Sequence, residues 1–442
     1  MSSIFASLTK AGRKHLQGED VAGVTKVVDL CNDDALESIN AAGTGIVELL
    51  KADTSDAVNL AEEILQPDRV VMKFNLNLNG SLADQPFFIA PFACTVKSIQ
   101  EIHSVAGNDA SAVTAVVKKV SDGAALTAGT ALMSDTFDMK GTANTLQTGT
   151  MSSTASDLEL AENDRLYVDF TGTLTTLAGV VLTVVLSPGA KANLAVFNMN
   201  ANAELLDQCF FIANRPMKIR AIKYAHTTKG TDASAVNAQV VKDTGTDAPG
   251  AGTDLLTNNT NVGFNCKGDI NTVEEGALSA TVANLLLAPG DRLSLDFAGT
   301  ITALAGVVIV VEFEPSPGRI DVVFNLLTNA QLTDQAFFIA NRQYQIEAIS
   351  EVHSVAGTDG SAVSAQVTID NLTDAPGAGT DVLSNNTNVG FDMKGTANTV
   401  QVGTFKDTRE NFLLPGDRLS VDMAGTITTL AGAVVVATLK AA

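Results

Sequence analysis

The sequence of 442 residues contains no tryptophan, only three tyrosines and only four cysteines. The cysteines, Cys31, Cys94, Cys209 and Cys266, include no CxxC pair and stand at places that do not repeat along the chain. A disulfide framework or a zinc site needs cysteines at matched spacings, so we expect free and mostly buried thiols. Such thiols suit a protein that folds in a reducing cytoplasm.

Positive charge is also scarce, because 28 lysines and arginines stand against 49 aspartates and glutamates. The formal net charge of −21 at pH 7 repels phosphate backbones and anionic lipid surfaces, so we expect neither nucleic acid nor a membrane as a partner. Charged residues make up only 17% of the chain, and threonine, alanine, asparagine and glycine take their place. That composition suits turns and the solvent side of strands.

Targeting segments and catalytic motifs are missing as well. No apolar run approaches the ~18 residues of a membrane span, and the N-terminus has no long apolar core of a signal peptide. No GxSxG, P-loop, HExxH or strand-linked GxGxxG pattern occurs. We therefore expect no catalytic residue, no cofactor and no enzymatic activity.

One unit of roughly 125 residues occurs three times in the chain. Its motifs are Asp-Gln-x-Phe-Phe-Ile-Ala from Asp84, Asp207 and Asp334; Phe-x-x-Lys-Gly from Phe137, Phe264 and Phe391; Asp-Arg-Leu-x-x-Asp from Asp164, Asp291 and Asp417; and Leu-Ala-Gly from Leu177, Leu304 and Leu430. Each copy is large enough to be a domain. We place the boundaries near Pro67, Pro188 and Pro317, so that residues 67–187 form repeat 1, residues 188–316 repeat 2 and residues 317–442 repeat 3.

Each repeat is predicted to consist of β-strands. Apolar and polar residues alternate from Arg292 to Phe297, which indicates a strand with one buried face, and the run 306–311 indicates a strand buried on both faces. On the polar face, the arginines at the start of this strand, Arg165, Arg292 and Arg418, are expected to pair with a neighbouring acid in solvent. We count seven or eight strands per repeat, which favours three tandem antiparallel β-sandwiches of jelly-roll-like form.

Residues 1–66 have a different pattern. Apolar residues recur at helical spacing after Ser55, a good N-cap, and shorter amphipathic stretches precede it. Short helices of this kind make a poor independent core. We expect a helical segment that acts as an anchor or an oligomerisation element.

A histidine recurs at equivalent positions, His103, His226 and His353. A Gly-x-Asp-x-Ser-Ala-Val segment follows each one and contains Asp109, Asp232 and Asp359. A metal site would need a cluster of ligands, and no second histidine is nearby in sequence. We expect histidines at strand ends that bond to turns, and an interface or pH-sensing role is the alternative.

The sequence contains two further acidic patterns. The Asp-Ala-Pro-Gly-Ala-Gly-Thr-Asp segments carry the weak calcium candidates Asp247, Asp254, Asp374 and Asp381. Their spacing matches no known calcium loop, so a surface loop without metal is favoured. Asp164 and Asp169 are five residues apart on one strand and point to opposite faces, which argues against a glycosidase-type carboxylate pair.

The Phe-Phe-Ile-Ala strand, the Pro-Gly-Asp-Arg-Leu-Ser turn and the closing Leu-Ala-Gly-Val-Val strand resemble the small β-sandwich modules of tailed-bacteriophage virion proteins. Capsid decoration (cement) proteins and head fibres are the nearest match, and the resemblance spans residues 67–442. It implies a protein made in the host cytoplasm that binds the major capsid protein or other virion proteins on the capsid exterior. It also implies a homo-oligomer, such as a trimer.

A host-recognition protein of the tail-fibre or adhesin type is the alternative. Such a protein binds carbohydrate through tandem modules. The absence of tryptophan and the three tyrosines argue against it, because sugar-binding platforms depend on stacked aromatic rings.

Overall fold

The computed structural model describes residues 15–17, 27–29, 70–76, 84–187, 193–199, 207–314, 318–326, 334–371, 373–406 and 411–441. The chain divides into two compact units, Met1–Pro67 and Asp68–Ala442. In the first unit, β1 (His15–Gln17) pairs antiparallel with β2 (Val27–Asp29). The helices predicted within residues 1–66 lie outside the described residues.

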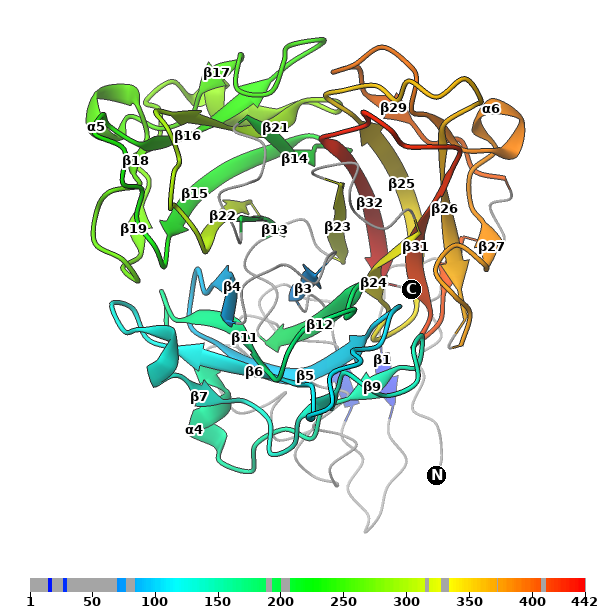
Figure 1. Cartoon of the computed structure of the whole chain (residues 1–442), viewed down its shortest axis with the longest axis horizontal. Coiled ribbons are helices and arrows are strands. Elements are labelled where there is room, and N and C mark those ends of the chain that lie inside the picture. Colours follow the sequence, from blue (N-terminus) through cyan, green and yellow to red (C-terminus); the bar gives the residue numbers. More distant parts are fainter. Residues whose placement is uncertain are drawn as a thin grey trace. The chain divides into compact units, whose positions relative to one another are not determined.

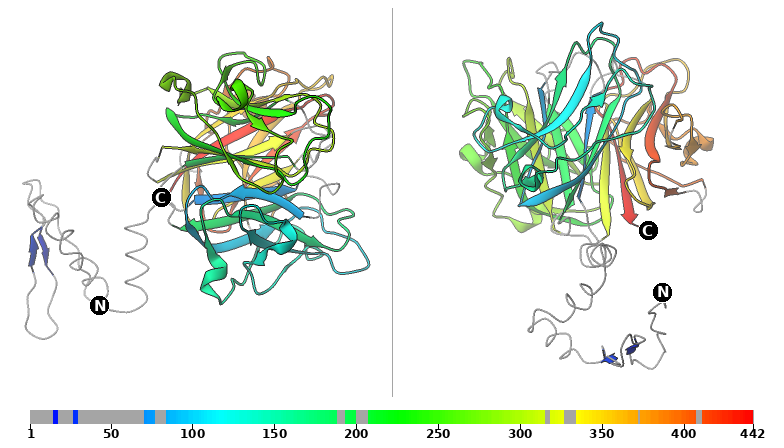
Figure 2. Two further views of the ribbon diagram at one scale, coloured as in Figure 1. Left: turned by 90° about the vertical axis from the view of Figure 1, so that its left-hand side faces the viewer. Right: turned by 90° about the horizontal axis from the view of Figure 1, so that it is seen from below.

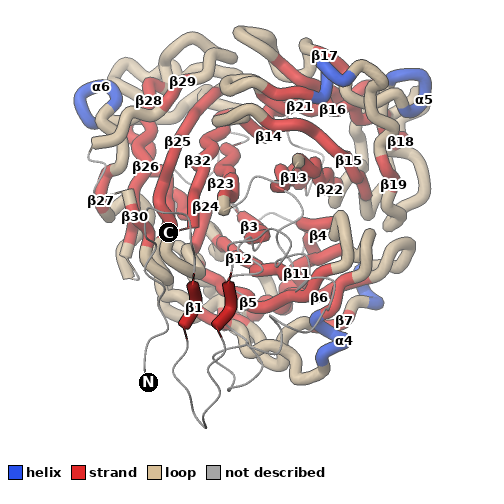
Figure 3. Tube along the Cα trace, turned by 180° about the vertical axis from the view of Figure 1, so that it is seen from behind, coloured by secondary structure: helices blue, strands red, loops and turns tan. Residues whose placement is uncertain are grey.

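The second unit is mainly β, as predicted, with several antiparallel sheets (Figure 3). In repeat 1 the longer strands are β3 (Val70–Leu76), β4 (Asp84–Ile89), β5 (Cys94–Ile102), β6 (Thr114–Val120), β11 (Arg165–Thr171) and β12 (Val180–Ser187). The short elements are η1 (Leu126–Ala128), β7 (Thr130–Ala131), β8 (Phe137–Asp138), β9 (Gln147–Thr148), α4 (Ala155–Leu158) and β10 (Glu159–Leu160).

Repeats 2 and 3 contain the same series of strands. Repeat 2 has β13 (Asn193–Met199), β14 (Gln208–Ile212), β15 (Met217–Ala225), β16 (Asn237–Asp243), β17 (Thr253–Asp254), α5 (Asn258–Asn261), β18 (Phe264–Asn265), β19 (Glu274–Glu275), η2 (Val282–Leu285), β20 (Leu286–Leu287), β21 (Arg292–Ala298) and β22 (Val307–Phe313). Repeat 3 has β23 (Arg319–Leu326), β24 (Gln335–Ile339), β25 (Tyr344–Val352), β26 (Ser364–Asp370), β27 (Thr380–Asp381), α6 (Asn385–Asn388), β28 (Phe391–Asp392), β29 (Gln401–Val402), β30 (Phe412–Leu413), β31 (Arg418–Ala424) and β32 (Ala433–Ala441).

The strands of each repeat form two five-stranded sheets. In repeat 1, one sheet has the order β10-β5-β12-β3, with β9 also paired to β5, and the other has the order β4-β11-β6-β7, with β8 also paired to β6. Repeats 2 and 3 have the same two orders. The predicted count of seven or eight strands was too low, because four strands in each repeat are only two residues long and lie within turn-rich sequence.

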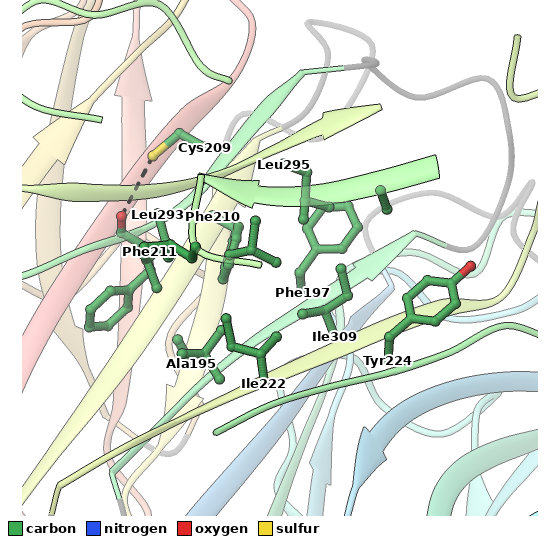
Figure 4. Close-up of a cluster of buried hydrophobic side chains, with 14 of the residues drawn as sticks. Ala195, Phe197, Cys209, Phe210, Phe211, Ile222, Tyr224, Leu293, Leu295 and Ile309 are labelled. Carbon is green, nitrogen blue, oxygen red and sulfur yellow. Dashed lines mark hydrogen bonds between the residues drawn. The ribbon is translucent and has the colours of Figure 1, made fainter. Parts of the chain in front are cut away.

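Apolar side chains from both sheets of a repeat gather in one buried cluster. In repeat 2, Phe197 from β13 meets Phe210 from β14 edge to face, with ring centroids 5.8 Å apart (Figure 4). Leu293 and Leu295, the apolar residues predicted from the alternating pattern, point into the same cluster. The period-two pattern therefore gives the core face of this strand correctly.

The three repeats follow one another around a central axis (Figure 1). Strand β4 of repeat 1 packs against β22 of repeat 2, β14 of repeat 2 against β32 of repeat 3, and β24 of repeat 3 against β12 of repeat 1. The same pair of surfaces meets at every junction, so the contact is heterologous and closes after three steps. Figure 2 shows this three-repeat unit from two other sides.

Packing at the junctions explains why a continuous apolar run occurs near the end of each repeat. Every residue of β22 is buried. Val307, Ile309 and Val311 belong to the core cluster of repeat 2, whereas Val308 and Val310 belong to the core cluster of repeat 1. One face of the strand packs inside its own repeat and the other packs on its neighbour, so the predicted burial on both faces is confirmed.

A glycine recurs after the Asp-Arg-Leu strand for a steric reason. Gly172, Gly299 and Gly425 have φ angles of +92°, +83° and +83°. A Cβ atom at Gly299 would overlap the carbonyl oxygen of Ala235. Only glycine fits a left-handed conformation at so close an approach of two backbones.

Among the residues that the structure describes, no helix is long and apolar enough to cross a membrane. Cys94, Cys209 and Cys266 are free and buried, as the sequence predicted. Cys31 lies outside the described residues.

Candidate functional site

The three repeated histidines lie just after β5, β15 and β25, and all are buried, with exposed fractions of at most 1%. His103 Nδ1 is 3.1 Å from Glu101 Oε1, and its Nε2 is 3.3 Å from the carbonyl oxygen of Gly141. His353 makes the same contacts with Glu351 at 3.0 Å and with Gly395 at 3.3 Å. Repeats 1 and 3 therefore each contain a fully buried histidine–glutamate pair.

A glutamine completes each pair. Gln147 donates to Glu101 over 2.7 Å, and Gln401 donates to Glu351 over 2.7 Å. Burial would lower the pKa of both histidines, but the hydrogen bond and charge of the glutamate outweigh it and raise the pKa above 6.5. Burial also raises the pKa of both glutamates.

Repeat 2 lacks this pair, because Tyr224 occupies the place of the glutamate. The Tyr224 ring stacks on Phe264 at 4.9 Å and lies 5.4 Å from the ring of His226. Neither ring nitrogen of His226 has a hydrogen-bond partner. Burial, with smaller contributions from the charges of Lys229 and Arg165, lowers the pKa of His226 to about 4. The pKa of the histidine at this position is therefore lowered in repeat 2 and raised in repeats 1 and 3.

The repeated aspartates hold loops together. Asp109 accepts hydrogen bonds from the Ser111 hydroxyl at 2.7 Å and from the Thr173 backbone N–H at 3.0 Å. Asp232 and Asp359 accept the same two bonds from Ser234 and Thr300 and from Ser361 and Thr426. The serine bond, followed by the backbone bond, holds the pKa of each carboxyl well below its usual range.

The Phe-x-x-Lys-Gly loop lies between the histidine and the aspartate of each repeat. In repeat 1, Lys140 Nζ donates to the carbonyl oxygens of Asp109 and Ser111, while Gly141 O faces His103. Lys394 makes the same two bonds to Asp359 and Ser361. The structure thus brings the two predicted segments to one end of each repeat, where the lysine of one loop is bonded to the aspartate segment of the other.

The weak calcium candidates have separate roles. Asp247 accepts from the backbone N–H of Thr244 at 2.9 Å, and Asp374 accepts from that of Asn371 at 3.0 Å, so both close turns. Asp381 pairs with Lys406 at 2.9 Å, and Asp254 is exposed on β17. Within the described ranges, no group of three histidine, cysteine or acidic side chains could hold a metal ion.

The arginines of the Asp-Arg-Leu motif lie in a different environment from the one predicted from the sequence. Arg165, Arg292 and Arg418 were expected on the solvent face beside an acid, but each is only 1% exposed. Arg292 donates to the carbonyl oxygens of Gly245 and Asp247 in its own repeat. It also donates to the carbonyl oxygen of Asn398 in repeat 3 at 2.8 Å. Loops of two repeats cover the strand face that the alternation predicted to be wet.

Repeat 1 reaches repeat 2 in the same way. Arg165 donates to Ala124 O at 2.5 Å in its own repeat and to Asn271 Oδ1 at 3.1 Å in the next. Asn271 and its equivalents Asn144 and Asn398 have φ angles near +60°, a left-handed conformation that asparagine tolerates better than most residues. Arg165 and Arg292 therefore join the repeats by hydrogen bonds to main-chain and amide oxygens.

A second missed feature is a cross-strand pair of carboxylates. Asp84 on β4 lies directly opposite Asp169 on β11. The first residue of the Phe-Phe-Ile-Ala motif and the last of the Asp-Arg-Leu-x-x-Asp motif thus come together. Burial raises the pKa of Asp84, and a hydrogen bond to Asp169 and its charge raise it further. In repeat 1 Lys118 lies 2.5 Å from Asp169 and offsets part of the repulsion.

Repeat 3 has the equivalent pair, Asp334 and Asp422, with Thr368 in the place of Lys118. Burial raises the pKa of Asp422, and the charge of Asp334 adds to the effect, with smaller contributions from Asp381 and Asp370. Like charges opposite each other in a sheet destabilise it. A raised pKa in the folded state means that the carboxyl favours folding below pH 3.8, and this contribution is lost as the pH rises through the folded-state pKa.

Asp422→Asn is therefore expected to stabilise the protein at pH 7 by about 0.2–1 kcal/mol, because it removes one of two facing charges. The gain should vanish in acid, where the carboxyl is protonated. Urea unfolding at pH 7 and pH 3.5 measures both values. Asp169→Asn is the matched control in repeat 1 and should give no gain, since it also removes the partner of Lys118. An equal gain from both variants would contradict the assignment.

No protein-family model matches the chain, and no curated protein is significantly similar to it in sequence. Evidence on the function of the chain therefore comes from the geometry of the repeats and from the residues that join them.

Proposed function

We propose that the chain is a non-catalytic structural protein of a tailed-bacteriophage virion, of the capsid decoration or head-fibre type. Its partners would be the major capsid protein or other virion proteins on the capsid exterior. Residues 67–187, 188–316 and 317–442 would be three tandem jelly-roll β-sandwiches, and residues 1–66 a helical anchor. The observation that carries the proposal is the closed succession of three equivalent two-sheet repeats with buried junctions.

The strand order supports the jelly-roll assignment. A jelly roll contains eight strands in two facing sheets with two Greek-key connections. If β7 and β8 count as one interrupted strand and β9 and β10 as another, repeat 1 has eight strands, and the chain passes to the other sheet at every connection except the one from β6 to the β7/β8 strand. Both sheets contribute to one core cluster, as facing sheets of a sandwich do.

The arrangement of the repeats supports a role in a symmetric particle. Three equivalent repeats around one axis supply within one chain the threefold arrangement expected of a trimer (Figure 1). We also propose that whole chains associate into homo-oligomers. Multiple equal surfaces on one chain suit attachment to a surface that itself repeats, because each additional contact is intramolecular.

The chemistry of the repeated residues favours a structural role over a catalytic one. The histidines are buried beside glutamates or an aromatic ring, and the aspartates are fixed by serine and backbone donors. A general base needs access to a substrate proton, which the buried histidines do not have. The partly exposed aspartates are weak bases, because their pKa is held well below its usual range.

Aromatic exposure bears on the carbohydrate-binding alternative. Phe412 is the one aromatic residue among the large apolar side chains that are exposed in the described ranges. Sugar-binding surfaces usually present several aromatic rings. This distribution favours the virion proposal over host recognition.

Co-sedimentation with phage capsids that lack the protein tests the proposal. We expect the full-length chain to bind saturably, and a chain without residues 1–66 to lose binding if that segment is the anchor. Circular dichroism of the shortened chain checks that its strands persist. Binding to cells or glycans without binding to capsids would overturn the proposal in favour of host recognition.

A further inference from the structure

The three junctions between repeats are equivalent in architecture but differ in covalent connection and in bonding. Chain segments link repeat 1 to repeat 2 and repeat 2 to repeat 3, whereas no chain segment links repeat 3 directly to repeat 1. The junction of repeats 3 and 1 is called the seam below. Its apolar cluster consists of Ile102, Val181, Ala336 and Ile339, with Leu146 packed on it.

The arginine contact distinguishes the seam from the other junctions. Arg165 Nη1 has an acceptor in repeat 2 and Arg292 Nη1 has one in repeat 3. Arg418 Nη1, at the seam, is buried and has no hydrogen-bond partner. Its Nη2 bonds only within repeat 3, to the carbonyl oxygens of Asn371 and Asp374. A buried N–H group without an acceptor raises the free energy of the closed seam. In an open seam, water reaches the group and removes this cost.

Apolar packing shows the same difference. Val308 and Val310 of repeat 2 belong to the core cluster of repeat 1, and Val434 and Val436 of repeat 3 belong to that of repeat 2. At the seam, Val181 belongs to a small cluster that is separate from all three cores. Opening the seam therefore exposes this small cluster and leaves the three core clusters of the repeats intact.

We infer that the seam is an exchangeable interface, through which repeat 3 of one copy of this chain docks on repeat 1 of a second copy. Both copies carry the same two complementary surfaces, β24 with Ala336 and Ile339 and β12 with Val181. A contact that closes within one chain also forms between chains when the ring opens, as in domain swapping. The exchange does not depend on attachment to a capsid.

The chain supplies its own control for seam opening. Ala336 at the seam and Cys209 at the junction of repeats 2 and 3 occupy the same place in the Phe-Phe-Ile-Ala motif, and they are 5% and 4% exposed. In the Ala336→Cys variant, the introduced thiol is expected to react with a thiol reagent at least ten times faster than Cys209 under native conditions. Peptide mass spectrometry locates the label. Equal or slower reaction at position 336 would overturn the inference.

Pairing between copies is tested by complementation. Val181→Asp blocks the repeat 1 surface and Ile339→Asp blocks the repeat 3 surface, so neither chain can close its own ring. Each variant alone is expected to be a monomer, and an equimolar mixture to form a heterodimer by light scattering. Failure to form this heterodimer from folded variants would overturn the inference. Should either variant fail to fold, native mass spectrometry of mixed ¹⁴N and ¹⁵N unsubstituted chains decides it: mixed-mass dimers support exchange, and their absence overturns it.

Discussion

Arg292→Ala is expected to destabilise the protein by about 3–5 kcal/mol, because it leaves buried acceptors unsatisfied at a junction. Arg292 is 1% exposed and donates to Gly245 O, Asp247 O and Asn398 O. Each buried acceptor left without a donor costs about 1–3 kcal/mol, and partial access of water limits the total. The midpoint of urea unfolding, followed by circular dichroism, measures the loss.

Arg418→Ala is the matched control for this prediction. It removes the equivalent side chain at the seam, where Nη1 has no acceptor to lose. The loss should be smaller than for Arg292→Ala by about 1–3 kcal/mol, the contribution of one hydrogen bond from a charged donor. Arg292→Lys separates charge from geometry, since an ammonium group cannot fork to several carbonyls as a guanidinium does. Equal losses for the two alanine variants would show that the inter-repeat bond contributes nothing.

The strands could be predicted from the sequence because their burial follows local rules. Alternation along residues 292–297 gave the core positions, and the β-branched run after Gly306 gave a strand buried on both faces. Each strand pattern also occurs three times in the chain, which supports the assignment of the strands. What covers the second face of β22 could not be predicted, because that face packs on another repeat.

The arginines could not be placed from local pattern. A charged residue on an alternating strand normally faces solvent, and here a loop from the next repeat covers it. A signal was nevertheless present, because the arginine recurs in every copy. The facing carboxylates were out of reach for a different reason, because Asp84 and Asp169 are far apart in sequence and meet only through strand register.

The buried histidine–glutamate pairs were within reach of the sequence. Glu101 and His103 are two residues apart, and residues at that spacing on a strand share a face. The same Glu-x-His pattern occurs at Glu351 and His353, whereas repeat 2 has Tyr224 before His226. The metal-site hypothesis considered only a second histidine as a ligand, so it did not include the acid two residues earlier.

The two kinds of histidine have opposite effects on stability as the pH changes. The pKa of His353 is raised in the fold, so its contribution to stability is fully present below pH 6.5 and is lost as the pH rises through the folded-state pKa. The raised pKa of Glu351 acts in the same direction. The pKa of His226 is lowered to about 4, so its contribution is present above pH 6.5 and is lost as the pH falls towards 4.

Glu351→Gln should convert His353 to the behaviour of His226. Without the carboxylate, burial governs the imidazole, although Asp392 still favours its charged form, and the pKa of His353 should fall below 6.5. We expect a loss of about 3–5 kcal/mol at pH 5, where the histidine would have to be buried with an uncompensated charge or lose its proton. The loss should shrink above pH 7, where a neutral imidazole no longer needs the carboxylate.

Urea unfolding between pH 5 and pH 8 and NMR titration of the imidazole signals test this reversal together. His226→Gln is the matched control: it removes a histidine that must stay neutral in the fold, so it should stabilise the protein by about 2 kcal/mol at pH 5 and leave stability at pH 8 nearly unchanged. A loss for Glu351→Gln that is the same at pH 5 and pH 8 would mean that the pair acts through packing alone. A loss confined to acid would instead show that the carboxylate is present to hold a buried positive charge. The contribution of His353 to stability is then lost as the pH rises, whereas that of His226 is lost as the pH falls.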